Sequence, residues 1–260
     1  MKKIYPLLFL LAFSLSLNAQ NNARDIMQKA RLRTQLKGLE AVSTLIIRNP
    51  KGNERVRTTA LASKSYPGDI EKRLIRFLEP ADVRGMGMLI VDYEDRDDDM
   101  WVYMPSSRKS RRIVSTEKSK SFMGSEFSNA DMSAPLLDDF NFSLLGEEKI
   151  GEQLCWKIRS TPINREKEDE YGFQYRISWV SKSEYINLRS ENYDFEGRLH
   201  KVVKITGYVM LDKKNEAYLV TEMQIENKLN GRNSTMIMQK YEYNPNVPDR
   251  YFTVSFLENF

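Results

Sequence analysis

Apolar and polar residues alternate with a period of two along most of the chain, and this pattern predicts a protein made mainly of β-strands. The alternation is clearest over residues 173–179, where an aromatic or aliphatic residue holds every odd position. It returns over residues 219–226 and 235–243, on either side of an Asn-Gly pair at 230–231 that predicts a hairpin turn. Further strands are expected over residues 44–48, 55–64, 72–78, 86–93 and 100–104. About nine to eleven strands in all predict a curled antiparallel sheet or barrel.

One amphipathic helix is predicted near the N-terminus. Ala23, Ile26, Met27 and Ala30 have the spacing of a single helical face, with polar residues opposite them. Gly38 is a suitable stop, after which the period of two begins. The helix therefore precedes the sheet and is expected to pack on it.

Residues 115–145 interrupt the alternation. The segment is rich in Ser, Asp and Asn, and its apolar residues do not follow a strand pattern. They are Phe122, Met123, Phe127, Met132, Phe140 and Phe142. Left uncovered, these side chains would form an unusually large apolar patch, so we expect a loop with short helices lying across one face of the sheet. Within it, residues 121–127 are predicted to form a mobile lid with Gly124 as its hinge, since glycine gives the backbone freedom there.

The strand at residues 100–104 is apolar on both faces, which is unusual for an antiparallel sheet with one solvated side. Both faces must therefore be covered, and one interpretation is that one face packs beneath a helix while the other lines a cavity. Trp101 and Tyr103 share a face and are predicted to line or border that cavity. Half of the 12 methionines lie in this part of the chain. They are Met86, Met88, Met100, Met104, Met123 and Met132. Methionine suits surfaces that accept apolar partners of varied shape, although it also fills gaps in ordinary cores.

Residues 1–19 have the layout of a cleavable secretory signal peptide: two lysines, an apolar run and a small residue before Gln20. The apolar run is too short to span a bilayer. No cysteine follows it, so a lipid-anchored N-terminus is not expected. Without these lysines the formal net charge falls from +4 to +2, which gives no indication of nucleic-acid binding. Residues 20–260 are expected to form one domain, and Cys155 has no second cysteine with which to form a disulfide.

Signals for catalysis or metal binding are weak. His200 is the only histidine and no G-x-S-x-G elbow is present, so a nucleophilic triad is not expected. One His and one Cys cannot form a His-rich or Cys-rich zinc site. The acidic run at 94–99 lacks the glycine and the final glutamate of a calcium loop and is interpreted as a solvated turn. Asp138 and Asp139 form a carboxylate pair of the kind that a glycosidase uses, but acids are common in loops and the sequence does not give their separation. We predict no enzyme, no metal and no cofactor.

A basic turn follows the doubly apolar strand. It contains Arg108, Lys109, Arg111 and Arg112. A solvated surface turn is one interpretation. The other is a contact with lipid phosphates or with an acidic partner, because the forked guanidinium binds phosphate and carboxylate in a two-pronged manner.

Several blocks resemble the outer membrane lipoprotein-sorting proteins of the LolA-like group. The central block has W-x-Y-x-P at residues 101–105, the basic turn, and S-F-M-G-S-E-F at residues 121–127, with Asp131 after it. An upstream R-F-x-x-P-A-D-x-x-G at residues 76–85 and a tail over residues 243–253 also match. Ser181 and Asn187 depart from the group's usual Asp and Pro. The resemblance covers nearly the whole chain after the signal peptide.

This resemblance implies a half-open β-barrel whose concave apolar face is closed by helices and a loop. It implies a monomeric periplasmic carrier of lipid or acylated lipoprotein, associated with an inner-membrane exporter of the RND type. Under this hypothesis the cavity or lid residues are Met86, Met88, Trp101, Tyr103, Phe122, Met123 and Phe127, and Arg108, Arg111 and Arg112 contact headgroups or a partner. The alternatives are an accessory subunit of such an exporter that carries no cargo, and an envelope hydrolase.

Overall fold

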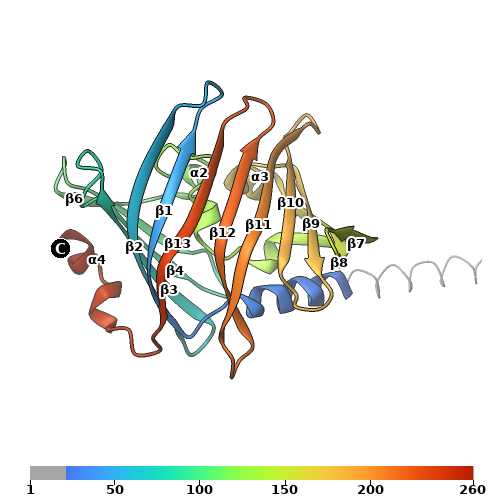
Figure 1. The fold of residues 1–260 in the computed structure, drawn as a ribbon, viewed down its shortest axis with the longest axis horizontal. Coiled ribbons are helices and arrows are strands. Elements are labelled where there is room, and N and C mark those ends of the chain that lie inside the picture. The colour runs from blue at the N-terminus through green and yellow to red at the C-terminus, as the bar shows by residue number, and fades with distance from the viewer. Residues whose placement is uncertain (1–21, 260) are drawn as a thin grey trace, which may run out of the picture.

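One antiparallel sheet forms most of the protein (Figure 1). The computed structural model describes residues 22–259. Within them, 13 strands lie in the order β6-β5-β4-β3-β2-β1-β13-β12-β11-β10-β9-β8-β7. Strands adjacent in the sheet are also adjacent in sequence, except that β1 pairs with β13 and so joins the two halves of the sheet.

The strands are β1 (Gly38–Arg48), β2 (Glu54–Tyr66), β3 (Ile70–Glu79), β4 (Gly87–Asp92), β5 (Asp99–Met104), β6 (Lys109–Arg112), β7 (Phe140–Ile150), β8 (Gln153–Pro162), β9 (Tyr175–Ser181), β10 (Asn187–Tyr193), β11 (Leu199–Asp212), β12 (Ala217–Asn227) and β13 (Asn233–Tyr243). The helices are an unlabelled N-terminal helix at 22–33, α2 (Ser115–Lys118), α3 (Arg165–Tyr171) and α4 (Val254–Glu258), with the 3-10 turns η1 (Ala130–Met132), η2 (Leu137–Asp139) and η3 (Asp249–Phe252).

The sheet is curved but does not close into a barrel. Its edges, β6 and β7, follow each other in the chain yet do not pair. Residues 113–139, which we call the crossing segment, lead from one edge to the other and contain α2, η1 and η2. Three of the four residues of β6 are cations, which discourages pairing of that edge with another chain. This arrangement confirms the half-open antiparallel barrel expected from the sequence.

Two terminal segments cover the sheet. The N-terminal helix buries Ala23, Ile26 and Ala30 against Ile158 and Val180 of β8 and β9, as the spacing of its apolar residues predicts. No helix among residues 22–259 is long and apolar enough to cross a membrane.

The C-terminal segment lies on the other face of the sheet. Leu257 and Phe252 pack there with Leu74 and Leu89. Arg76 of β3 donates hydrogen bonds to the carbonyls of residue 256 at 2.9 Å and Leu257 at 2.8 Å. These bonds satisfy carbonyls at the end of α4 that the short helix leaves without partners.

Buried ion pairs bridge the open side of the sheet. Lys118 at the end of α2 is 2.6 Å from Glu170 of α3 and 3.3 Å from Asp98 in the turn between β4 and β5. Only 6% of the Lys118 side chain and 2% of the Glu170 side chain are exposed. Burial alone would lower the pKa of Lys118, but Asp98 and Glu170 raise it overall. Burial raises the pKa of Asp98 above its usual range, despite the attraction of Lys118.

Lys167 of α3 extends these contacts. Its Nζ lies 2.7 Å from Asp97, 3.0 Å from Glu170 and 3.1 Å from Asp139. The hydroxyl of Tyr171 donates a 2.7 Å hydrogen bond to Asp139. The hydrogen bond from Lys167 holds the pKa of Asp97 below its ordinary value. The β4–β5 turn, α2, α3 and η2 are therefore joined through a network with more acids than lysines, which we call the closing network.

Two expectations differ from this fold. The sheet has 13 strands rather than about nine to eleven; at one edge, β6 is a short polar strand of four residues that shows no alternation of apolar residues. Residues 140–145 are part of β7 and not of the loop. Phe142 is buried while Asn141 and Ser143 are exposed, so the alternation is present but was obscured by the irregular segment before it.

We predict that Lys118→Met destabilises the protein by roughly 3–5 kcal/mol at neutral pH, because it leaves the buried Asp98 without its cation and removes one of the two lysines beside Glu170. The measurement is the free energy of unfolding in urea, compared between the variant and the wild-type protein. The loss should shrink as the pH falls through the raised pKa of Asp98, because Asp98 then takes up a proton and no longer needs a cation beside it. Lys120→Met is the matched control. Lys120 pairs with Glu117 at 3.5 Å and is 65% exposed, so its loss should cost less than about 1 kcal/mol. Equal effects of the two variants would contradict a stabilising role for the closing network.

Candidate functional site

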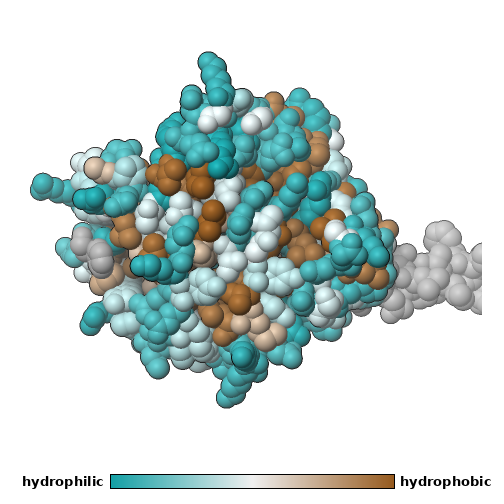
Figure 2. All heavy atoms as spheres, viewed as in Figure 1, coloured by the Kyte–Doolittle hydropathy of each residue, from teal (hydrophilic) through white to brown (hydrophobic). Residues whose placement is uncertain are grey.

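A cavity of about 450 Å³ lies between the concave face of the sheet, the N-terminal helix and the crossing segment. Its volume falls within the range typical of small-molecule sites. Most of the lining is apolar and comes from both halves of the sheet. The apolar lining includes Leu39, Leu45, Leu61, Ile75, Val203, Ile205, Leu219, Met223, Met236, Met238, Phe122, Phe127, Phe140, Phe142 and Phe173. Figure 2 shows the outward face of β1 and β11–β13, where hydrophilic residues predominate and apolar residues form separate patches.

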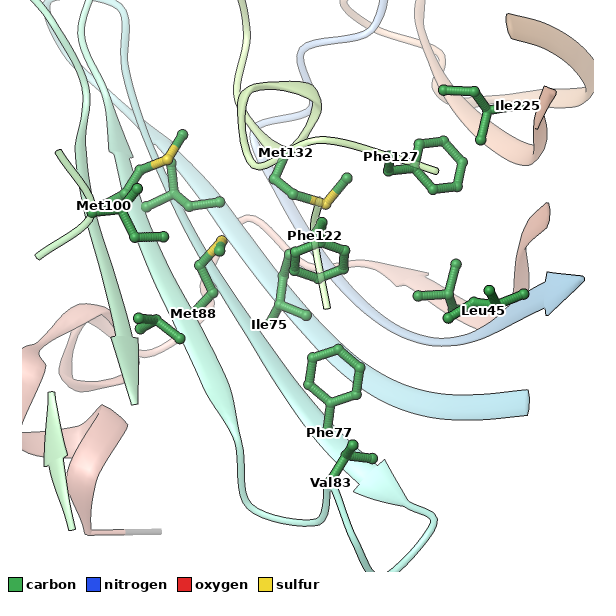
Figure 3. Packing of buried hydrophobic residues seen from close by; sticks show 14 residues of the cluster. Leu45, Ile75, Phe77, Val83, Met88, Met100, Phe122, Phe127, Met132 and Ile225 are labelled. Carbon is green, nitrogen blue, oxygen red and sulfur yellow. The ribbon is translucent and has the colours of Figure 1, made fainter. Parts of the chain in front are cut away.

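The crossing segment closes one end of this cavity with aromatic side chains. Phe122 and Phe127 are 1% exposed and point into the main apolar cluster, together with Met132 (Figure 3). The ring of Phe122 lies 5.9 Å from that of Phe77 on β3. Two of the predicted lid residues therefore contact both the sheet and the cavity.

Cations from the sheet and from the β12–β13 turn hold the backbone of this segment. Arg57 of β2 donates to the carbonyl of Met123, and Arg232 donates to the carbonyl of Gly124 at 2.7 Å. Lys201 of β11 donates to the carbonyl of Glu126 at 2.7 Å. A turn has few partners for its own carbonyls, and these bonds supply them from the sheet.

Glu126 fixes the same turn through its side chain. Its carboxylate lies 2.8 Å from Arg232 and accepts a 2.9 Å hydrogen bond from Asn227. The Glu126 amide donates to the hydroxyl of Ser234 at 3.0 Å. With 8% of the side chain exposed, this acid is a buried anchor between the crossing segment and the β12–β13 hairpin. Sequence reasoning did not single it out, although an acid between two phenylalanines was a visible signal.

Gly124, the predicted hinge, has a φ of +77°, and a side chain there would meet no atom within 4 Å. Met123 before it also has a positive φ of +50°. Two successive left-handed residues make a tight turn that glycine adopts without strain.

The predicted methionines lie in the apolar cluster rather than on the cavity surface. Met88 is fully buried, and Met86 and Met123 pack against the same cluster. Figure 3 shows Met88 and Met100 on the sheet side of this cluster. They pack in the same buried cluster as Phe122, which closes one end of the cavity.

Trp101 and Tyr103 lie outside the cavity, which corrects the prediction that they border it. They pack on the opposite face of the sheet, against the C-terminal segment with Phe256 and Leu257. The alternate residues Met100 and Val102 are the ones that face the concave side. Both faces of the strand are covered as expected, but period two alone does not tell which face is concave.

The predicted basic residues lie at the β5–β6 turn and on β6, away from the cavity. Arg111 pairs with Glu117 at 2.7 Å, and Arg112 pairs with Asp99. Both arginines keep 59% of their side chains exposed, and Arg108 is exposed as well.

The residues considered for catalysis do not converge. Cys155 is buried in an apolar cluster, and burial raises the pKa of its thiol. His200 lies 3.4 Å from Asn227, and burial lowers its pKa. Asp138 pairs with Arg24 of the N-terminal helix, whereas Asp139 belongs to the closing network.

Charged and polar side chains also line the cavity, and sequence reasoning did not identify them. Arg73 of β3 bonds to Glu71 at 2.7 Å and to the carbonyl of Met132. Beside it, Asp92 is 1% exposed, and burial raises its pKa to about 8 although Arg73 favours the charged form. On the other side of the opening, Arg176 of β9 lies in the cavity wall. Arg and Ser at inward positions of alternating strands were the signal for such residues.

Comparison with known proteins gives a consistent assignment. A family model described as an uncharacterized protein matches residues 69–259. The chain is 25% identical, with a TM-score of 0.84, to a domain from Vibrio parahaemolyticus described as an outer membrane lipoprotein-sorting protein; 92% of this chain and 99% of that chain are covered. A DUF1329 family protein from Desulfovibrio piger is 28% identical, with a TM-score of 0.83 and the same coverage.

A LolA superfamily protein from Nitrosomonas europaea shares the fold, with a TM-score of 0.68, at 22% identity over 90% of this chain and 98% of that one. None of the curated proteins matches the chain.

Proposed function

The chain belongs to the family of LolA-like, outer membrane lipoprotein-sorting proteins, and from this premise we propose that it is a periplasmic carrier of acyl chains. The observation that carries the proposal is the cavity of about 450 Å³ with its mainly apolar lining. Each CH₂ group moved out of water gains about 0.8 kcal/mol, so an acyl chain is a favourable occupant. The proposed cargo is a lipid or an acylated lipoprotein, bound by a monomer and exchanged with an inner-membrane exporter of the RND type. No catalytic activity is proposed. Residues 1–19, the expected signal peptide for export, lie outside the described residues.

We predict that the protein purified from its native host contains acyl lipid, identified by mass spectrometry of organic extracts. Val203→Trp, which places a large side chain in the cavity wall of β11, should reduce the bound lipid several-fold. Val209→Trp is the matched control, since Val209 lies on the same strand with 36% exposure. A stable exporter complex whose carrier yields no acyl species would favour the accessory-subunit alternative. Equal lipid content in the two variants would contradict this cavity as the binding site.

The lid proposal follows from the contacts of residues 121–127. Phe122 and Phe127 fill one end of the cavity, so cargo that extends there must displace them. The turn is held by hydrogen bonds and by the buried Glu126, which can be released without unfolding the sheet. We propose that cargo exchange uses this release, with Gly124 as the point of rotation.

We predict that Glu126→Gln increases amide hydrogen exchange of residues 121–132 by about ten-fold for each 1.4 kcal/mol of lost anchoring. The control is Glu117→Gln in the same segment, where the pair with Arg111 lies at the surface. Binding of palmitate should also change exchange in these residues in the wild-type protein. High protection that neither Glu126→Gln nor palmitate alters would identify a fixed plug and refute the lid.

The exposed arginines are proposed to meet headgroups or an acidic surface of the exporter. Changing Arg108, Arg111 and Arg112 together to Gln should shift the Tm little, because exposed pairs contribute about 0.2–1 kcal/mol each. Lipid transfer between anionic liposomes should slow at low salt, and the effect should fade at moderate salt. Changing Lys213 and Lys214 to Gln, in the turn between β11 and β12, provides the control. Wild-type transfer rates with an unchanged salt response would show that the turn is only solvated surface.

A further inference from the structure

A polar patch interrupts the apolar wall of the cavity on β8, β9 and β10. Arg176 and Ser178 alternate on the inward face of β9. Ser160 is the register partner of Arg176 on β8, and Ser190 is the partner of Ser178 on β10. Asn187 lies near the start of β10, and all five residues line the cavity. Serine and asparagine here stand in place of the aliphatic residues and methionines that predominate on the inward face of β11 and β13, so this part of the wall is polar.

Part of this patch is satisfied internally. The hydroxyls of Ser178 and Ser190 lie 3.2 Å apart, and the amide of Asn187 donates to Ser190 at 2.8 Å. The hydroxyl of Ser160 and the amide oxygen of Asn187 are buried without a hydrogen-bond partner among residues 22–259. Ser160 is 4% exposed. A buried polar atom left in this state costs about 1–3 kcal/mol, which indicates that a further polar group belongs beside it.

Arg176 is the cation of the patch and is only partly neutralised. Its Nε donates a 2.7 Å hydrogen bond to Asn192, and its guanidinium lies 4.6 Å from the centre of the Phe173 ring. Asp131 of the crossing segment is 3.6 Å from Nη2, beyond hydrogen-bond reach. The two terminal nitrogens therefore make no hydrogen bond to another residue in the described part of the chain. Burial lowers the pKa of Arg176, although Asp131 opposes the shift.

We propose that this patch binds the anionic headgroup of an acyl ligand, a carboxylate or a phosphate, while the chain lies along the apolar wall of β1 and β11–β13. The terminal nitrogens of Arg176 form the fork that suits either group. Ser160 adds a hydroxyl donor next to it. The proposal rests on the carrier function and narrows it to cargo that buries its charged end inside the protein.

The test uses three ligands with the same 16-carbon chain: palmitate, hexadecyl phosphate and 1-hexadecanol. Affinities are measured on the delipidated protein by displacement of a polarity-sensitive fluorescent dye. The wild-type protein should bind one or both anions roughly ten-fold or more tightly than the alcohol, as expected for charge-assisted hydrogen bonds. A preference for palmitate assigns the site to a carboxylate, and a preference for hexadecyl phosphate assigns it to a phosphate.

Arg176→Gln should remove the preference by weakening the anions while leaving hexadecanol within about two-fold, and Arg176→Lys should retain part of it. Arg189→Gln is the matched control, since Arg189 lies on the opposite face of β10 and pairs with Glu191 at 2.5 Å. A ratio of anion to alcohol affinity that Arg176→Gln leaves unchanged overturns the proposal. Equal binding of all three ligands by the wild-type protein also overturns it and leaves the carrier function standing. Binding of none of them contradicts the carrier function itself.

Discussion

The ion pairs of Lys118 and Lys167 close the open side of the sheet, and the half-open form of the protein depends on them. A sheet of 13 strands with a consistent twist would bring its edges together, and hydrogen bonds between β6 and β7 would then close a barrel. Instead, α2 and α3 lie at the opening and bind each other and the β4–β5 turn through Glu170, Asp98 and Asp97. Side-chain contacts thus take the place of a strand ladder. The crossing segment leads from one edge of the sheet to the other across this opening.

A cavity persists because the open side of the sheet is closed by ion pairs between charged side chains and not by packing of apolar side chains. Protein interiors normally pack without voids, and an empty apolar space of this size would be costly. Here the walls are held apart by the curvature of the sheet on one side and by charged pairs on the other, so the apolar side chains cannot collapse onto one another. Phe122 and Phe127 fill only one end. The remaining space is lined by side chains from both halves of the sheet and from the N-terminal helix.

The crossing segment joins stability to function through two different kinds of contact. Its first part contributes Lys118 to the closing network and is fixed. Its middle part is held at residues 123–126 by hydrogen bonds to carbonyls and by the single buried acid Glu126. Contacts of the second kind are few and local, so they can open at a free-energy cost well below that of global unfolding. Under the proposed lid function, this one connection holds the opening apart and also controls access to the cavity.

The sequence by itself indicated most of the strands, the N-terminal helix and a curled antiparallel sheet, because period two and period 3.6 are local properties of neighbouring residues. The half-open form was implied by the resemblance to LolA-like proteins. It also predicted that residues 115–145 cover one face of the sheet, since Phe122 and Phe127 had to be buried somewhere, although residues 140–145 proved to be part of β7. Only the tertiary structure decided which face was concave, and so placed Trp101 and Tyr103 under the C-terminal segment rather than in the cavity. The same holds for the acidic turn, whose Asp97 and Asp98 looked solvated until α2 and α3 brought lysines to them. Curvature and long-range pairing involve residues far apart in the chain, and alternation along one strand carries no information about either.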